Sequence, residues 1–263
     1  METITQSRPS LTNNDAAVLQ ALFDAESSPS SGIKVNPTLP SWPATVNISQ
    51  KDLATLKTRE TQIILNLQAS STPNPETVQT ALEELDTLLE EYPTYPSAYT
   101  NRAQTLRLLA DLNYKQHTTQ NTESESESST DESLFTPEAS ELSSRVFADL
   151  GKAITLATPV SPADPISSVQ ARLLADAHTH RGYLLLKAAR VKKTRSGVEV
   201  GSVGPERLRG HSADQLEEMA SRDFFLGGRY GNKVAQQMAV QTNPYAKMCG
   251  AIVKEAMRKE MEG

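Results

Sequence analysis

The sequence is short of the residue types that mark several classes of protein. Its 263 residues include one cysteine, Cys249, so no intramolecular disulfide and no cysteine-rich metal cluster can form. Only 37% of the residues are hydrophobic and 5% aromatic, so we expect much of the chain to lie outside a core. No apolar run approaches the roughly 20 residues that span a bilayer, and the first residues do not resemble a secretory signal. These absences predict a soluble protein of the cytoplasm, and also of the nucleus, without a membrane partner.

Motifs of catalysis and of nucleic-acid binding are missing as well. The chain has no Gly-rich phosphate loop, no nucleophile elbow, no metal-ligand cluster and no paired acids in a defined setting. We therefore expect no cofactor and no metal ion, and an enzyme is only a remote alternative. The net charge is −6, and five acids between residues 123 and 132 account for most of it (−6 + 5 = −1). The rest of the chain is nearly neutral, which disfavours general binding to nucleic acid.

The sequence does contain a segment that occurs twice. Residues 98–106 read Ala-Tyr-Thr-Asn-Arg-Ala-Gln-Thr-Leu, and residues 177–185, 79 positions later, read Ala-His-Thr-His-Arg-Gly-Tyr-Leu-Leu. Each copy precedes a second run in which a small residue, a bulky residue and another small residue are spaced by four and three, and so share one helical stripe. A run of the second kind also occurs once upstream. The repeated positions are Tyr99, Ala103, Leu106, Val146, Leu150 and Ala153, then His178, Gly182, Leu185, Ala220, Phe224 and Gly227, with Ala81, Leu85 and Leu88 upstream.

This spacing is typical of the tetratricopeptide repeat (TPR), a pair of antiparallel helices that pack closely where small residues face bulky ones. The sequence therefore predicts an all-α fold, a TPR solenoid of three helix-turn-helix repeats with an N-terminal helix and a C-terminal capping helix. The predicted parts are an arm over 1–49 with a helix at 14–24 and a Pro/Ser linker, a degenerate first repeat over 50–95, a second over 96–160, a third over 166–231 and the capping helix over 232–263.

Two insertions account for the spacing of 79 residues instead of 34. The first, at about 115–137, has a stretch of Ser, Thr, Glu and Asp without aliphatic residues, so we expect it to be a disordered loop. The second, at about 192–211, is rich in Gly, Lys and Arg. Ser124, Ser126 and Ser128 stand beside acids, which makes them candidate phosphorylation sites, and a solvated tether is the plainer interpretation.

Charged residues recur at fixed positions of the repeat. Arg102 and Arg181 each precede the small residue of the first helix, and Asp149 and Asp223 each precede the bulky residue of the second helix. We expect each Arg to pair with an Asp. His178 occupies the position that Tyr99 fills in the previous repeat, which favours a packing role over metal binding.

The first helices of a TPR stack line its concave surface, where partners bind. Here the residues on that stripe are Asn101, Gln104, Arg107, Asp176, Thr179, His180, Tyr183 and Lys187, spaced by three or four as one face requires. These polar side chains are suited to holding an extended peptide by hydrogen bonds. A merely solvated face is the alternative.

Two segments outside the repeats add a resemblance. Asn14-Asp-Ala-Ala-Val-Leu-Gln-Ala-Leu-Phe23 and Asn243-Pro-Tyr-Ala-Lys-Met-Cys249 resemble the two ends of the tetratricopeptide repeat protein 36 family. The resemblance implies a non-catalytic adaptor linked to regulation of tyrosine metabolism, through protection of 4-hydroxyphenylpyruvate dioxygenase. It also implies binding to the 70-kDa heat-shock chaperone.

A co-chaperone with a carboxylate clamp is the main alternative function. Such a clamp holds the acidic tail of a chaperone with Lys, Asn and Arg side chains of the first helices. Asn101 matches the Asn of the clamp, but the other positions fall on Arg59, Ile63, Asp176 and His180. An acidic tail would therefore meet Asp176, which disfavours this interpretation.

Overall fold

The computed structural model describes residues 33–69, 73–121, 130–161, 164–194 and 204–243, together with Glu255, Arg258 and Lys259. Helices dominate this part of the chain, which confirms the predicted all-α class. They are α2 (Gln50–Gln68), α3 (Pro75–Glu91), α4 (Pro96–Asn121), the 3-10 helix η1 (Thr130–Phe135), α5 (Ser140–Ala157), α6 (Ser168–Thr194), α7 (Glu206–Arg209), α8 (Ala213–Arg229) and α9 (Lys233–Thr242).

Several helices begin at residues whose side chains satisfy the free N–H groups of the first turn. The Ser49 side chain accepts a hydrogen bond from the backbone N–H of Asp52 at the start of α2. At the start of α3 the Asn74 side chain accepts one from the backbone N–H of Thr77, and Pro75 is the first helical residue. Ser212 and Gln215 form a capping box at the start of α8. These local signals fix where the helices begin, independently of the packing that follows.

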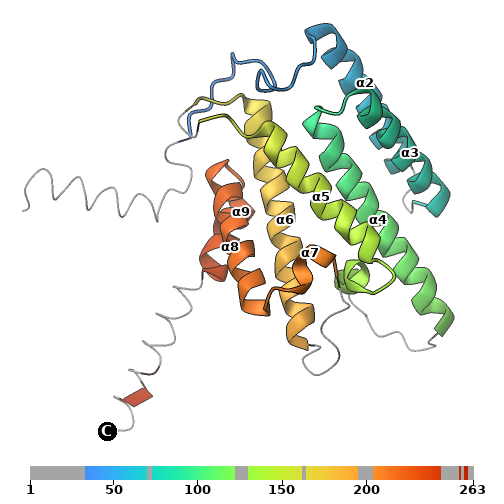
Figure 1. The fold of residues 1–263 in the computed structure, drawn as a ribbon, viewed down its shortest axis with the longest axis vertical. Coiled ribbons are helices and arrows are strands. Elements are labelled where there is room, and N and C mark those ends of the chain that lie inside the picture. The colour runs from blue at the N-terminus through green and yellow to red at the C-terminus, as the bar shows by residue number, and fades with distance from the viewer. Residues whose placement is uncertain are drawn as a thin grey trace, which may run out of the picture.

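The helices pack in succession, as Figure 1 shows: α2 and α3 lie at one side of the molecule, the long helices α4, α5 and α6 run through the middle, and α8 and α9 lie at the other side. The most extensive contacts join α6 with α8, α4 with α5, and α8 with α9, and smaller ones join α3 with α4, α5 with α6, and α2 with α3. The repeated small and bulky positions form the core between these helices, and Tyr99 is the one that remains half-buried. Local helical periodicity therefore identified the packing faces.

Glycine permits the closest approach of α6 and α8. A methyl group added to Gly182 would lie 3.2 Å from Cδ1 of Phe224, and one added to Gly227 would lie 2.7 Å from Oγ1 of Thr179. Both are tighter than ordinary van der Waals contact, so larger residues would push the helices apart. The small residues of the repeat have the packing role that their spacing predicts.

The Pro/Ser segment before α2 does not behave as the extended linker that its composition predicts. Residues 33–49 lie against the helices: Val35 forms a parallel β-bridge with Ile166, and the Ser167 hydroxyl donates to the carbonyl of Ser41. Trp42 and Val46 are buried, and the Trp42 ring meets the Tyr95 ring edge to face at 6.1 Å. Burial of two large apolar side chains outweighs the weak secondary-structure preference of a Pro-rich segment.

Both insertions are shorter than predicted. Helix α4 continues to Asn121, and after residues 122–129, which lie outside the described ranges, Leu134 and Phe135 of η1 are buried. Helix α6 likewise continues to Thr194, and the ammonium of Lys192 donates to backbone carbonyls of Leu208, Arg209 and His211. Leu208 of α7 is buried as well. A few apolar side chains at the end of each insertion are enough to fold its last part onto the helices.

The described part of the predicted capping segment over 232–263 contains one helix, which is shorter than the segment. Helix α9 ends at Thr242, and Asn243 adopts an extended conformation. Pro244 explains this stop, because proline disfavours the helical conformation of the residue before it. The predicted N-terminal helix at 14–24, the candidate phosphorylation sites Ser124, Ser126 and Ser128, and Cys249 lie outside the described residues.

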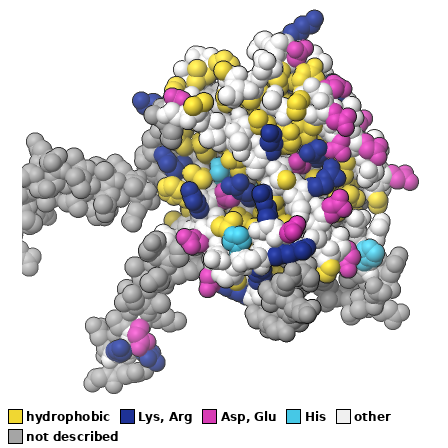
Figure 2. Space-filling view, in the orientation of Figure 1, with side chains coloured by type: hydrophobic (Ala, Val, Ile, Leu, Met, Phe, Trp, Pro, Cys, Tyr) yellow, Lys and Arg dark blue, Asp and Glu magenta, His cyan; other side chains and the backbone are white. Residues whose placement is uncertain are grey.

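The exposed surface of α3 is acidic. This helix contains five Glu and one Asp without a Lys or Arg, and Figure 2 shows acidic side chains gathered along the edge of the molecule that α2 and α3 form. In the described part of the chain, no helix combines the length and the apolar character needed to cross a membrane.

Candidate functional site

A groove runs between α4 and α6. It consists of two adjoining hollows of about 360 Å³ and 530 Å³, both lined by Gln104, Asp176 and His180. Residues from the beginnings of α4 and α6 line the first hollow and later residues of the same helices line the second, so the groove follows both helices. Leu150 of α5 contributes to the lining of the first hollow.

The first hollow contains a buried carboxylate from α2. Glu60 accepts hydrogen bonds from the Tyr95 hydroxyl at 2.7 Å and from Nδ2 of Asn101 at 2.6 Å. Burial raises the pKa of Glu60, and the hydrogen bonds from Ser97, Tyr95 and Asn101 offset part of that rise. Glu60 thus joins α2 to α4 and fixes the side chain of Asn101.

Two exposed cations, Lys57 of α2 and Arg172 of α6, line the same hollow. Among the described residues, neither side chain has a hydrogen bond or an ion pair. Trp42 of the N-terminal segment also lines this hollow, so residues 33–49 help to form the site. In the first hollow two cations are therefore available, Glu60 is already occupied by hydrogen bonds, and Asp176 is a second acid of the lining.

Arg107 and His180 meet at the junction of the two hollows. Nη1 of Arg107 lies 3.3 Å from Nε2 of His180, and since a guanidinium can only donate, the imidazole nitrogen accepts. Burial lowers the pKa of His180 to about 4, and the nearby charges of Arg107 and Lys187 add to the effect. His180 is therefore neutral at physiological pH and joins α4 to α6 without adding charge to the groove.

The second hollow, bordered by α9, exposes mainly apolar surface. Its lining includes Leu108 of α4, Phe224 of α8, and Val234 and Met238 of α9. Tyr183 of α6 also lines it with an exposed fraction of 38%, and its ring lies 4.3 Å from the Nζ atom of Lys187. Side chains of this kind are suited to holding an apolar group of a ligand.

Seven of the eight residues predicted for the concave face line this groove: Asn101, Gln104, Arg107, Asp176, Thr179, His180 and Tyr183. Lys187 was predicted wrongly to be exposed there. It is buried, and its ammonium lies over the Tyr183 ring. Asn101 was predicted to be available to a partner, but it is hydrogen-bonded to Glu60.

Sequence reasoning missed Trp42, Lys57, Glu60 and Arg172. The first three belong to segments without a recognisable repeat pattern, so no spacing placed them beside α4. Arg172 lies four residues before Asp176 on the predicted stripe, and extending the stripe by one turn would have found it.

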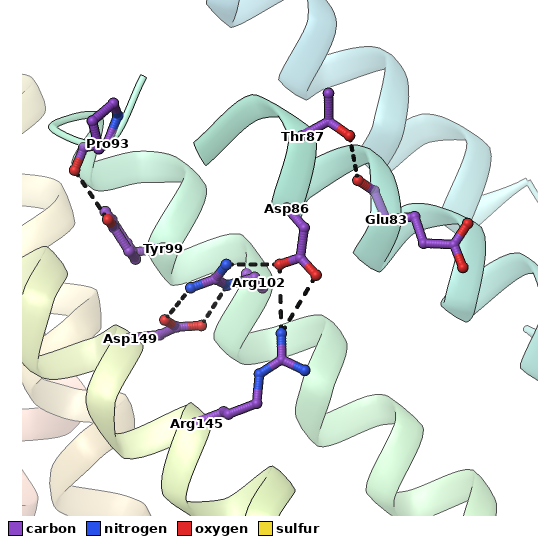
Figure 3. Close-up of polar contacts among 8 residues, drawn as sticks. All are labelled: Glu83, Asp86, Thr87, Pro93, Tyr99, Arg102, Arg145 and Asp149. Carbon is purple, nitrogen blue, oxygen red and sulfur yellow. Dashed lines mark hydrogen bonds and ion pairs between the residues drawn. The ribbon is translucent and has the colours of Figure 1, made fainter. Parts of the chain in front are cut away.

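The expected Arg–Asp pairing is confirmed in the first copy of the repeat, and Figure 3 shows its partners. Arg102 donates two hydrogen bonds to Asp149, at 2.9 and 2.7 Å, and a third to Asp86 of α3 at 2.7 Å. Arg145 also reaches Asp86, at 3.4 Å. This network joins α3, α4 and α5, and it raises the pKa of Arg102 even though burial of the guanidinium acts in the opposite direction.

The second copy confirms the pairing with different surroundings. Arg181 donates two hydrogen bonds of 2.7 Å to Asp223, and Nδ1 of His178 lies 2.8 Å from the same carboxylate. Burial acts to raise the pKa of Asp223, but the hydrogen bonds from Arg181 and His178 outweigh it and hold the pKa below its usual value. His178 also stacks on Tyr230 at 6.0 Å, so it combines packing with a polar contact.

The clamp positions do not assemble around a carboxylate. Arg59 is paired with Glu91 of α3 at 2.6 Å, and Ile63 is buried. Asp176 and His180 occupy the clamp positions of α6, and the exposed cations of the first hollow, Lys57 and Arg172, are not clamp positions. Within the described residues, no group of three or more His, Cys, Asp or Glu side chains could hold a metal ion.

Comparison with known proteins adds one relative of high identity. The chain is 61% identical over 263 residues to the "L-tyrosine degradation gene cluster protein hmgX" of Aspergillus fumigatus, covering 99% of this chain and 97% of that protein. No family model matches the sequence, and no solved structure matches it. An identity of this level over nearly the whole of both proteins shows common descent, and the chain therefore belongs to the family of the hmgX proteins.

Proposed function

We propose that this protein is a non-catalytic adaptor of tyrosine breakdown, which acts in the cytoplasm by holding a segment of a protein partner in the groove between α4 and α6. Two observations support the proposal. The groove is formed by first helices of consecutive helix pairs, as in a TPR stack. The relative from Aspergillus fumigatus is named for the gene cluster of L-tyrosine degradation.

The dimensions of the groove favour an extended segment of short length. On α4 the lining runs from Ser97 to Asp111, a span of 14 residues, or about 21 Å at 1.5 Å per residue. An extended chain of about six residues covers the same length at roughly 3.3 Å per residue. We propose an enzyme of tyrosine breakdown as the owner of this segment, and 4-hydroxyphenylpyruvate dioxygenase is the first candidate by family resemblance.

Affinity capture from native cells, followed by mass spectrometry, tests the proposal. The test variant combines Gln104→Ala with Tyr183→Ser, since both side chains are exposed in the groove. Asn101→Ala is unsuitable, because it removes a hydrogen bond from buried Glu60, at a cost of about 1–3 kcal/mol. We expect capture of a tyrosine-breakdown enzyme by the parent protein and a loss of affinity of about tenfold or more, or about 1.4 kcal/mol, in the variant.

A matched control combines Gln79→Ala on α3 with Phe225→Ala on α8. These side chains are exposed like Gln104 and Tyr183 but do not line the groove. Equal loss in test and control variants, or no loss in either, would reject the groove as the binding site. Capture of heat-shock chaperones alone would replace the adaptor by the co-chaperone alternative, and turnover of a substrate by the purified chain would replace both.

A further inference from the structure

The two hollows of the groove differ in chemistry, and this difference restricts what can bind there. The first hollow presents Lys57 and Arg172, and neither makes a hydrogen bond or an ion pair with a described residue, although the charge of Lys57 acts to lower the pKa of Glu60. The second hollow presents an apolar wall that includes Leu108, Val234 and Met238. A ligand that fills both hollows would therefore place a polar part in the first and an apolar part against this wall of the second.

The available charge in the first hollow is positive. Glu60 is buried, and both of its carboxylate oxygens already accept hydrogen bonds from Tyr95 and Asn101. Asp176 lies at the junction of the hollows and accepts a long hydrogen bond of 3.4 Å from Asn232. An acidic group in the first hollow would face both cations and could form charge-assisted hydrogen bonds, whereas a basic group there would meet two like charges.

The apolar hollow is incompletely covered in this structure. Val234 has an exposed fraction of 61%, and the Tyr183 ring is also partly exposed. Both residues line the same hollow as Leu108 and Met238, so their exposed apolar surface is available to a partner. Such a surface would take one large aliphatic side chain, or two adjacent ones.

We propose that the groove selects an extended protein segment with an acidic residue between Lys57 and Arg172 and a large aliphatic residue against Tyr183, Val234 and Met238. This inference rests on the proposed adaptor function and specifies the partner segment. The separation of the two anchors follows from α6: Arg172 and Tyr183 are 11 positions apart (183 − 172), which corresponds to about 16 Å along a helix. In an extended chain that distance equals about five residues.

The only tryptophan of the chain provides a direct signal of occupancy. Trp42 lines the first hollow, so its fluorescence reports binding there without a label. The probe is a blocked peptide with two leucines at one end, two aspartates at the other and four serine or threonine residues between, made in both chain directions. A second peptide has lysines in place of the aspartates, and a third has alanines in place of the leucines.

We expect one direction of the acidic peptide to give a saturable change in Trp42 fluorescence. The lysine and alanine peptides should bind at least tenfold more weakly. The charge-reversal variant Lys57→Glu with Arg172→Glu should lose at least tenfold affinity for the acidic peptide and gain affinity for the lysine peptide. The matched control, Lys51→Glu with Arg190→Glu, changes exposed cations on the same two helices outside the groove and should bind within twofold of the parent.

Three results would overturn the inference: equal binding of the lysine peptide by the parent chain, an equal loss in the control variant, or no saturable signal up to millimolar peptide. Capture of the native partner separates this failure from failure of the adaptor proposal. If Gln104→Ala with Tyr183→Ser weakens capture but Lys57→Glu with Arg172→Glu does not, the groove binds the partner by other chemistry. If neither variant weakens capture, both proposals are wrong.

Discussion

The two copies of the repeated segment have the same ion pair in different settings. In the first copy Arg102 contacts Asp149 and also Asp86 of the preceding helix pair, whereas in the second copy Asp223 is the one acid that Arg181 contacts among the described residues. The position that follows the bulky residue holds Asp86 in α3 and Gly151 in α5, so the second copy has no equivalent acid. Instead, His178 occupies the remaining side of the Asp223 carboxylate.

This difference shows how a repeat becomes specific to its place in the chain. The bidentate Arg–Asp pair ties the two helices of one copy together, and it follows from the repeated sequence. The additional partner depends on which helix lies alongside, and it differs between the copies. The first copy is tied to its neighbour by charge, and the second is tied within itself.

The largest effects are expected from removal of the bulky core residue of each copy, and they show whether the two copies depend on it equally for stability. Phe224→Ala and Leu150→Ala each remove a fully buried side chain, so we expect losses of about 3–5 and 2–5 kcal/mol in the free energy of unfolding, measured by urea denaturation. Phe225→Ala is the control, since this neighbouring ring has an exposed fraction of 41% and should cost less than about 1 kcal/mol. Equal losses for Phe224 and Phe225 would contradict the burial of Phe224 between the helices.

Removal of the aspartate should cost more stability in the second copy than in the first. Asp223→Ala leaves Arg181 without an acid among the described residues, and we expect a loss of about 3 kcal/mol. Asp149→Ala should cost less, because Arg102 keeps Asp86. The double variant Asp86→Ala with Asp149→Ala should then cost more than the sum of its single changes. A strictly additive double variant would show that Asp86 does not substitute for Asp149.

Acid should weaken the second copy through Asp223. Because its folded pKa lies below the ordinary 3.8, the stability it contributes is present above pH 4 and is lost as the pH falls through the folded pKa. Glu60 has the opposite sign: burial raises its pKa above 4.5, so its contribution is present below that pH and is lost as the pH rises through the folded pKa. We expect the difference in urea midpoint between parent and Asp223→Asn to shrink as the pH falls from 7 to 3. The difference between parent and Glu60→Gln should instead shrink as the pH rises over the same range. Parallel pH profiles for the two variants would be inconsistent with these assignments.

The smallest effect concerns the insertion of the first copy. Replacing residues 122–129 by four Gly/Ser residues should change the free energy of unfolding by about 0.6 kcal/mol or less, since loop closure depends weakly on length. Replacing 116–136 should cost several times more, because it removes the buried side chains of Leu134 and Phe135. Similar costs for the two replacements would place the stabilising contacts elsewhere.

The difference between these replacements marks the limit of prediction from composition. Acidic and hydroxyl residues predicted a disordered loop over 115–137, and the prediction failed at the end of the segment because two apolar residues there reach the core. The prediction of an extended Pro/Ser linker failed for the same reason, because Trp42 and Val46 are buried. In both segments the mean composition is polar, but a few buried side chains determine the conformation.

The sequence by itself determined the helical class, the small and bulky packing positions and the recurrence of the Arg–Asp pair. Each of these depends on spacing within a helix or within one repeat, which the 3.6-residue period makes visible. Only the tertiary structure decided that Glu60 binds Asn101, that Trp42 and Arg172 border the groove, and that Lys187 is buried. Those contacts join segments far apart in the chain, and their partners depend on how the helices are placed, which no local pattern encodes.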